Sequence, residues 1–215
     1  NVTAAAACFG MAKNVVIVGD SKQLQHIVEE NSLSASEYGI DDCFDSVKHS
    51  ILTSIKALYK NKDLHVTLLR EHYRCNPYII EFCNKRFYNN DLIVMTRNTN
   101  NFPFEIIDVN AGKVQYKDGS WINTRQEAET QDVLKQLISS GISENEIAVI
   151  SPYRQHTNEL NKRIPEQIEA DTIHKFQGRE KQVVIFNSVR NNINDFIDNP
   201  NLINDFKGYV KTADT

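Results

Sequence analysis

Three polar blocks of the sequence contain residue types that could bind a nucleotide and assist its hydrolysis. The first is Gly19–Leu24, in which Asp20 precedes Gln23. A glutamine side chain both donates and accepts hydrogen bonds, so Gln23 could orient an attacking water and contact a phosphate oxygen. A simpler interpretation stays open, in which Gly19 and Asp20 form only a turn and Asp20 caps a helix.

The second block is Arg70–Cys75, which contains Tyr73 and Arg74. The guanidinium of Arg74 is always charged and planar, and it could stabilise negative charge on a phosphoryl group in transfer. The ring of Tyr73 offers a face on which a nucleobase can stack. The alternative is a surface arginine that pairs with Glu71 beside a half-buried tyrosine.

The third block, Ala170–Glu180, crowds Thr, His, Lys, Gln, Gly, Arg and Glu into one short segment. Gly178 allows a ligand to approach the backbone closely. Glu180 could accept a hydrogen bond from a ribose hydroxyl, while Thr172 and His174 could donate to a phosphodiester backbone. A solvated loop would show similar composition, so this alternative also stays open.

Short apolar, β-branched runs precede the polar segments and predict buried parallel strands. The four runs are Val15–Val18, Val66–Leu69, Ile147–Ile150 and Val183–Phe186. Ligand sites in open α/β sheets form beyond the carboxyl ends of the strands. Two further segments, Ser151–Gln155 and Asn187–Arg190, therefore join the candidates.

Helical signals separate these runs. Asn76 before Pro77 and the capping box Thr124–Glu127 predict two helix starts, and Ser151 before Pro152 predicts a third. The expected helices are Asp45–Lys60, Pro77–Tyr88, Thr124–Ser140 and Arg154–Arg163. A small antiparallel excursion is expected at Phe104–Val109, Lys113–Tyr116 and Ser120–Asn123. Together these elements predict an α/β fold with a mostly parallel sheet and helices on both faces.

Composition limits the possible partners. The net charge of −4 does not favour nucleic-acid binding, although only the contacting face needs to be basic. No apolar run approaches the ~20 residues that span a bilayer, so no membrane partner is expected. The four cysteines lack a C-x-x-C pair and zinc-ligand spacing, so we expect no metal site, no disulfide framework and a cytoplasmic location.

The order of four motifs resembles the C-terminal motor region of superfamily 1 helicases, in the branch of the nonsense-decay RNA helicase. The motifs are G-D-S-K-Q-L, H-Y-R-C-N-P, I-S-P-Y-R-Q and D-T-I-H-K-F-Q-G-R-E-K-Q-V-V-I-F. Each of the first three is short, but the fourth is highly specific, and the resemblance extends over residues 10–204. It implies a RecA-like fold of the P-loop NTPase type, with ATP and Mg²⁺ as cofactors and single-stranded DNA or RNA as partner.

The resemblance also implies roles for individual residues. Gln23, after Asp20, looks like the glutamine that senses the γ-phosphate. Arg74 resembles an arginine finger, and Tyr73 the aromatic residue that stacks on adenine. The remaining residues expected to contact nucleotide are Gly178 and Glu180, and those expected near nucleic acid are Pro152, Tyr153, Gln155, Thr172 and His174.

The resemblance divides the chain into residues 1–60, the tail of a first RecA-like domain, and residues 61–215, most of a second. We expect the rest of that N-terminal RecA-like domain to be a partner, because the sequence contains no G-x-x-x-x-G-K-[ST] loop. The expected final arginine is also missing after Asn201–Asn204. We therefore expect this chain alone not to hydrolyse ATP. A non-catalytic nucleic-acid-binding or protein-docking module with a helicase fold, and an unrelated doubly wound enzyme, are the alternatives.

Overall fold

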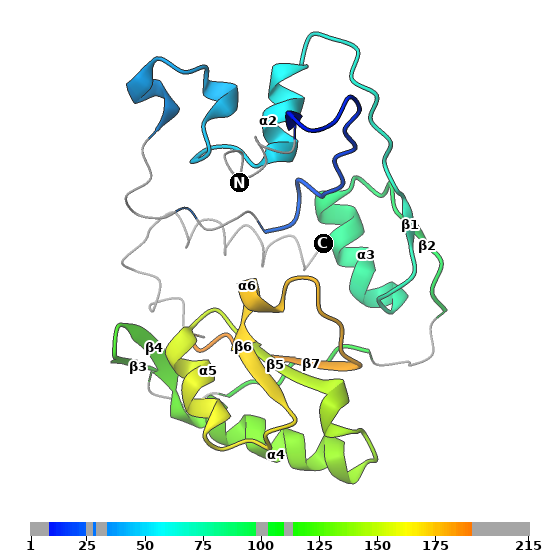
Figure 1. The fold of residues 1–215 in the computed structure, drawn as a ribbon. Coiled ribbons are helices and arrows are strands. Elements are labelled where there is room, and N and C mark those ends of the chain that lie inside the picture. The colour runs from blue at the N-terminus through cyan, green and yellow to red at the C-terminus, as the bar shows by residue number, and fades with distance from the viewer. Residues whose placement is uncertain (1–8, 25–27, 29–33, 98–102, 110–113, 191–215) are drawn as a thin grey trace. The chain divides into compact units, whose positions relative to one another are not determined.

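The computed structural model describes residues 9–24, 28, 34–97, 103–109 and 114–190, and forms two compact units. Unit 1 comprises residues 1–106 and unit 2 comprises residues 107–215 (Figure 1). The expected boundary at residue 60 concerns two RecA-like domains and stays a prediction. Among the described residues, no helix has the length and apolar character needed to cross a membrane.

Unit 1 is built from short elements. The 3-10 helices η1 (Ala35–Tyr38) and η2 (Asp42–Phe44) precede α2 (Ile51–Leu58). The parallel strands β1 (Glu71–His72) and β2 (Ile93–Val94) flank α3 (Pro77–Phe87) in the sequence. Asn76 caps α3 as predicted, since its side chain accepts a hydrogen bond from the Tyr78 N–H.

Two of the four predicted strands do not form. Residues 15–18 and 66–69 have no assigned secondary structure, and all of their side chains except that of Ile17 are exposed, with Val16 88% and Leu69 78% exposed. An apolar run becomes a strand only where a neighbouring strand supplies hydrogen bonds. Within the part of the chain that the structure describes, no strand pairs with either run. The helix expected at Asp45–Lys60 is also shorter than predicted, because Ser50 provides its N-cap.

Unit 2 contains a three-stranded parallel sheet in the order β6-β5-β7. Its strands are β5 (Ile147–Ser151), β6 (Glu169–Thr172) and β7 (Val183–Phe186). Three helices accompany them: α4 (Thr124–Ser139), α5 (Arg154–Asn161) and α6 (Ile173–Phe176), with the 3-10 turn η3 (Glu144–Glu146) before β5. This sheet confirms the predicted strands at 147–150 and 183–186.

The core of unit 2 lies between β5 and two helices. Ile147 and Val149 of β5 are fully buried, and Leu134 of α4 and Leu160 of α5 pack in the same cluster. Burial of such side chains contributes about 1.5–3 kcal/mol each. This cluster fixes the strand ends that carry the candidate residues.

The predicted antiparallel excursion is a two-stranded hairpin of β3 (Val114–Lys117) and β4 (Ser120–Asn123). Asp118 and Gly119 join the strands with φ of 49° and 81°, as a type I′ turn requires. The third strand predicted for the excursion, Phe104–Val109, is not formed.

Two predicted helix caps need correction. Asn123, and not Thr124, caps α4: its side chain accepts hydrogen bonds from the N–H groups of the second and third residues that follow it. Tyr153, and not Ser151, is the N-cap residue of α5, although Ser151 Oγ accepts a hydrogen bond from the Tyr153 N–H. Both helices begin at the predicted residues, Thr124 and Arg154, and only the cap residues differ from the prediction.

Candidate functional site

Asp20 organises the turn that contains Gln23. Its carboxylate accepts hydrogen bonds from the Lys22 N–H at 2.8 Å, from Gln23 Nε2 at 3.2 Å and from the hydroxyl of Tyr88. Burial raises the pKa of Asp20, but these hydrogen bonds outweigh it and hold the pKa below its ordinary value. The structure thus brings Asp20 and Gln23 together, and Asp20 also stabilises a turn, as the simpler interpretation proposed.

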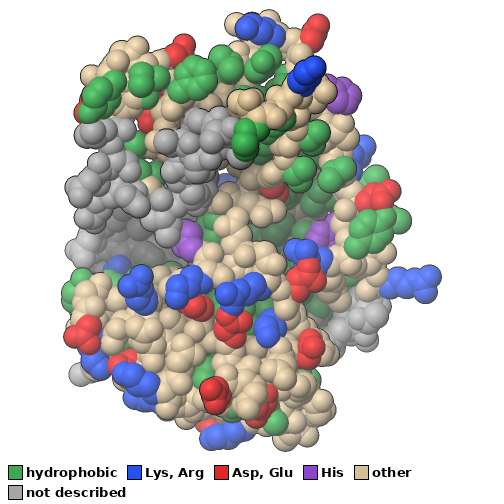
Figure 2. Space-filling view, viewed as in Figure 1, with side chains coloured by type: hydrophobic (Ala, Val, Ile, Leu, Met, Phe, Trp, Pro, Cys, Tyr) green, Lys and Arg blue, Asp and Glu red, His purple; other side chains and the backbone are tan. Residues whose placement is uncertain are grey.

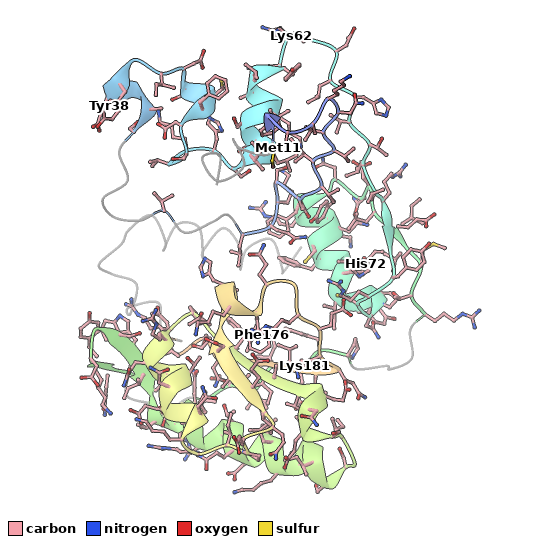
Figure 3. The ribbon with its side chains drawn as sticks, in the orientation of Figure 1. Met11, Tyr38, Lys62, His72, Phe176 and Lys181 are labelled. Carbon is pink, nitrogen blue, oxygen red and sulfur yellow. The ribbon has the colours of Figure 1, made fainter. Side chains whose placement is uncertain are left out.

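Tyr73 and Arg74 lie in the connection between β1 and the capped start of α3. The Tyr73 side chain is 65% exposed, and its hydroxyl donates a hydrogen bond to Glu71. His72, labelled in Figure 3, accepts a hydrogen bond from the Cys75 N–H at 2.8 Å. Burial, and then the charge of Arg74, lower the pKa of His72. A neutral imidazole therefore accompanies the exposed guanidinium.

Helix α3 connects the two candidate segments of unit 1. Arg74 lies before its N-terminal cap, Asn76, and Tyr88 at its C-terminal end donates to Asp20. Asn84 of the same helix bonds both the carbonyl and the N–H of Leu92, at 3.1 and 2.9 Å. Helix α3 thus follows one predicted catalytic segment in the sequence and is hydrogen-bonded through Tyr88 to the other.

In unit 2, candidate nucleic-acid contacts meet at the carboxyl edge of the sheet. Ser151 at the end of β5 is in register with Thr172 at the end of β6. Pro152 and Tyr153 follow β5. Thr172 is the last residue of β6, and His174 follows it. Because neighbouring parallel strands end at the same edge, the structure brings these four residues together, with Pro152 and His174 exposed.

Gln155 has a different setting. Its Nε2 lies 3.3 Å from carboxylate oxygens of Asp118 and Glu159, so it joins α5 to the turn of the hairpin. Lys117 and Lys162 donate to the same Glu159 oxygen, and their hydrogen bonds lower the pKa of Glu159 to about 2. Contact between Gln155 and nucleic acid stays a prediction.

The segment after β6 forms a short helix and then a left-handed turn. Gly178 has a φ of +84°, a conformation that favours glycine, and a Cβ added there would meet nothing within 4 Å. Phe176, labelled in Figure 3, ends α6, and the guanidinium of Arg179 lies 5.5 Å from its ring centroid. Gly178 and Glu180 are both exposed. They belong to unit 2, whereas Gln23, Tyr73 and Arg74 belong to unit 1.

A buried polar network holds the turn after β7, and our sequence analysis missed it. The Val189 N–H donates to Gln126 Oε1 at 2.8 Å, and the Val189 carbonyl accepts from Asn123 Nδ2 at 3.0 Å. Asn187 Nδ2 lies 2.9 Å from Thr130 Oγ1. The sequence signal for this network was three polar residues at the start of α4: the cap Asn123, then Gln126 and Thr130, which are all buried.

His156 completes this network at the centre of unit 2. Asn187 Nδ2 lies 3.2 Å from His156 Nε2, and the Asn123 N–H donates to Nδ1 at 3.4 Å. The side chain is fully buried, and burial lowers the pKa of His156 to about 4. His156 is therefore neutral at physiological pH and serves as a structural connector.

The described residues do not supply a magnesium site. No group of three or more His, Cys, Asp or Glu residues among them could hold a metal ion. The carboxylate of Asp20 already accepts hydrogen bonds from donors of three residues.

Positive and negative side chains are interspersed on the visible face of unit 2, and hydrophobic side chains are exposed over unit 1 (Figure 2). The exposed ring of Tyr73 beside Arg74 does fit one wall of an adenine-nucleotide site.

The parallel sheet of unit 2, with polar candidates at its carboxyl edge, defines an α/β domain. A family model described as an AAA domain matches residues 50–207, and the chain belongs to that family. It is 28% identical over 206 residues to the ATP-dependent helicase NAM7 of Saccharomyces cerevisiae, covering 84% of this chain and 20% of the relative.

Two further relatives agree with this assignment. The chain is 27% identical over 186 residues to the DNA replication ATP-dependent helicase/nuclease DNA2 of Gallus gallus, covering 84% of this chain and 17% of the relative. It is 24% identical over 220 residues to the regulator of nonsense transcripts 1 homolog of Neurospora crassa, covering 89% of this chain and 19% of the relative. The RecA-like fold and the resemblance to a superfamily 1 helicase motor region are confirmed. The chain spans about a fifth of the length of these relatives.

Proposed function

We propose that this chain forms one wall of the ATP site and part of the nucleic-acid path of a helicase that moves along single-stranded nucleic acid. The names of its relatives support ATP-dependent helicase activity in the family. The observation that carries the nucleic-acid part is the register of Ser151 with Thr172. It aligns two polar segments at the edge where α/β sheets bind ligands.

The nucleotide wall comprises Tyr73, Arg74 and Gln23. Bound ATP supplies the phosphoryl group whose transfer to water releases energy for movement. Tyr73 offers an exposed ring for the adenine, and Arg74 offers a charge that stabilises the transferring phosphoryl group. Gln23, held by Asp20, is a neutral side chain suited to orienting water. Gly178 and Glu180 are proposed to contact the nucleoside.

The nucleic-acid path uses the carboxyl edge of the sheet in unit 2. Thr172 and His174 can donate hydrogen bonds to the strand's phosphate and sugar groups, beside Pro152 and Tyr153. Contacts of this kind do not depend on base sequence, which suits a protein that moves along a strand. We assign residues 1–60 to a first RecA-like domain and residues 61–215 to a second. ATP hydrolysis then requires the P-loop of that first domain.

The test compares two groups of variants in a protein that joins this chain to a RecA-like domain carrying a P-loop. Arg74→Ala is expected to lower strand-stimulated kcat by about 10³-fold or more, with strand affinity kept. Thr172→Ala with His174→Ala is expected to weaken strand binding and to raise the strand concentration needed for stimulation. Lys135→Ala on α4 is the control, because its exposed side chain pairs with the exposed Asp132.

Two outcomes contradict the proposal. Strand-stimulated ATPase activity that survives Arg74→Ala would remove its assignment as the arginine finger. Strand binding without any ATPase activity in the joined protein would favour the non-catalytic nucleic-acid-binding module. For the chain of 215 residues alone, we expect no ATPase activity above background, and single-strand-stimulated turnover that Arg74→Ala abolishes would overturn that expectation.

A further inference from the structure

One oxygen of the Asp20 carboxylate is shared by two hydrogen-bond donors from distant parts of the chain. Oδ1 accepts the Lys22 N–H at 2.8 Å, whereas Oδ2 accepts both Gln23 Nε2, at 3.2 Å, and the hydroxyl of Tyr88. Lys22 and Gln23 belong to the same turn as Asp20, but Tyr88 lies 68 positions further along the chain. Tyr88 therefore brings a distant segment to the oxygen that holds the side chain of Gln23.

The position of Tyr88 is fixed by the end of α3 and the turn that follows it. The Tyr88 N–H donates to the carbonyl of Asn84 at 3.1 Å, and the Asn90 N–H donates to the same carbonyl at 3.0 Å. Asn89 and Asn90 supply the left-handed backbone of this turn, with φ of 51° and 62°. The buried side chain of Asn84 bonds both backbone groups of Leu92. The hydroxyl of Tyr88 thus projects from a helix end that is held by several hydrogen bonds.

The ionised carboxylate of Asp20 determines which way round the Gln23 amide lies. Because an ionised carboxylate only accepts hydrogen bonds, it must meet the Nε2 end of the amide, which leaves Oε1 as the end that can accept a hydrogen bond from water. A protonated Asp20 could donate to Oε1 instead and reverse the amide. Burial raises the pKa of Asp20, and among the groups that hold the pKa below its ordinary value Tyr88 has the largest effect.

The hydrogen bond between Tyr88 and Asp20 also crosses the proposed domain boundary. Asp20 and Gln23 belong to residues 1–60, which we assign to the first RecA-like domain, whereas Arg74 and Tyr88 belong to the second. Arg74 precedes the N-terminal cap of α3, and Tyr88 is the C-terminal cap of the same helix. Helix α3 therefore links the arginine proposed to stabilise the phosphoryl group with the glutamine proposed to orient water.

We propose that Tyr88 is a positioning residue for ATP hydrolysis, whose hydroxyl, bound to Asp20, holds Gln23 with Oε1 placed to accept a hydrogen bond from the attacking water. The inference rests on the proposed function and adds a residue outside the motifs that carry it. A tyrosine that only packed at the end of α3 would not need a charged acceptor for its hydroxyl. In this role Tyr88 acts only through Asp20 and Gln23, so its loss lowers kcat and leaves KM unchanged.

The first test is a double-mutant cycle in the protein that joins this chain to a RecA-like domain carrying a P-loop. Tyr88→Phe is expected to lower strand-stimulated kcat about 10-fold to 100-fold, with the KM for ATP and the strand affinity unchanged. Gln23→Ala is expected to lower kcat at least as much, and adding Tyr88→Phe to Gln23→Ala should cause no further loss. Tyr78→Phe, which changes an exposed tyrosine of the same helix, is the matched control and should keep the wild-type kcat.

The second test measures the hydrogen bonding of Gln23 directly in the chain of 215 residues, without ATP or nucleic acid. NMR follows the exchange of the Gln23 side-chain amide protons with solvent. Tyr88→Phe and Asp20→Asn are each expected to speed this exchange several-fold, whereas Tyr78→Phe leaves it unchanged. Circular dichroism gives the folded fraction of each variant. If Tyr88→Phe does not fold, Asp20→Asn breaks the same connection from its other end and replaces it in both tests.

Each failure has a distinct pattern. Unchanged kcat and unchanged Gln23 exchange in Tyr88→Phe overturn the positioning role and leave the proposed function intact. A kcat loss that is as large in the Gln23→Ala background as in the wild type also overturns it, because Tyr88 then acts apart from Gln23. Wild-type kcat in Gln23→Ala removes the catalytic role of Gln23, and the positioning role of Tyr88 with it. Absence of ATPase activity in the joined protein contradicts the proposed function and therefore this role as well.

Discussion

His156 Nδ1 lies 3.7 Å from the Glu127 carboxylate, and neither side chain is exposed to solvent. Arg163 approaches the same carboxylate at 3.0 Å from the other side. Burial lowers the pKa of His156 to about 4. Burial likewise raises the pKa of Glu127, although the charge of Arg163 opposes it. The centre of unit 2 therefore contains a neutral imidazole beside a carboxylate whose charge is opposed first by Arg163 and then by Lys117 and Lys162.

The first prediction concerns stability in mild acid. The unfolded chain protonates His156 near pH 6.5, whereas the folded chain does so only near pH 4. Because the unfolded state binds the proton first, the stability due to His156 is complete above pH 6.5 and is lost as the pH falls toward 4. A shift of this size corresponds to about 3 kcal/mol. Denaturant unfolding between pH 7 and pH 4, followed by Trp121 fluorescence, measures the loss.

The control for this prediction is His156→Gln, which lacks the titrating group. Glu127 is present in both proteins, and its raised pKa acts in the opposite direction, so the difference between the two pH profiles isolates His156. Parallel profiles would refute the prediction. If the variant does not fold, NMR titration of the wild type decides the question, because the His156 ring must titrate near pH 4.

The second prediction concerns the cap of α4. Asn123→Ala removes the acceptor for two helix N–H groups and the donor to the buried Val189 carbonyl. We expect a loss of about 2–4 kcal/mol in the free energy of unfolding. Thr124→Ala should change it by less than about 0.5 kcal/mol, because Thr124 is exposed. Comparable losses of unfolding free energy in the two variants would contradict the assignment of Asn123, and not Thr124, as the cap of α4.

The fold could be predicted from sequence where the determining contacts are local. Asn76 before Pro77 specified the start of α3, because a cap and a proline act within one turn. The strands predicted at 15–18 and 66–69 do not form, because a strand also needs a partner strand, which an apolar run does not specify. Strand β6 was missed for the opposite reason. Its sequence, Glu-Ala-Asp-Thr, is mainly polar, and only pairing with β5 makes it a strand.

The candidate site, like the fold, could be predicted where a general rule applies and could not where it depends on packing between distant segments. The proximity of Pro152 to Thr172 follows from a general rule, since parallel strands end at one edge. The connection of Asp20 to Tyr88 joins residues 68 positions apart and depends on how α3 packs. The network around His156 needs strands β4 and β7 and helices α4 and α5 to be placed first. The residue types in the sequence can identify such residues as candidates, but they do not identify the residues that they contact.

The third prediction concerns Gly178 and its left-handed backbone. A methyl group added at this position meets no atom within 4 Å, so Gly178→Ala introduces backbone strain and no clash. The expected cost is about 1–2 kcal/mol. Gly178→Asn should cost less than alanine, because asparagine tolerates this conformation better. Unfolding followed by Trp121 fluorescence gives the ranking, and equal stability of the wild type and Gly178→Ala would show that the turn is not maintained in solution.

The fourth prediction concerns the hydroxyl of Tyr88, which donates to Asp20. Burial, and then this hydrogen bond, raise the pKa of Tyr88 to about 12. A raised folded pKa means that the associated stability is present below pH 10 and is lost as the pH rises toward 12. Tyr88→Phe should therefore destabilise unit 1 by about 1–3 kcal/mol at neutral pH and remove the part of its alkaline pH dependence that Tyr88 contributes. Tyr78→Phe, on the same helix but 60% exposed, is the matched control.

Two measurements check the role of Tyr88. Denaturant unfolding gives the stability difference, and ultraviolet absorbance should show one tyrosine titrating near pH 12 in the wild type and not in Tyr88→Phe. Because Gln23 donates to the same carboxylate, the loss of Tyr88 also frees Asp20 to move with Gln23. Stronger amide exchange at Lys22 and Gln23 in Tyr88→Phe than in Tyr78→Phe would establish that α3 positions this turn. Equal exchange in the two variants would show that the turn holds Gln23 without help from α3.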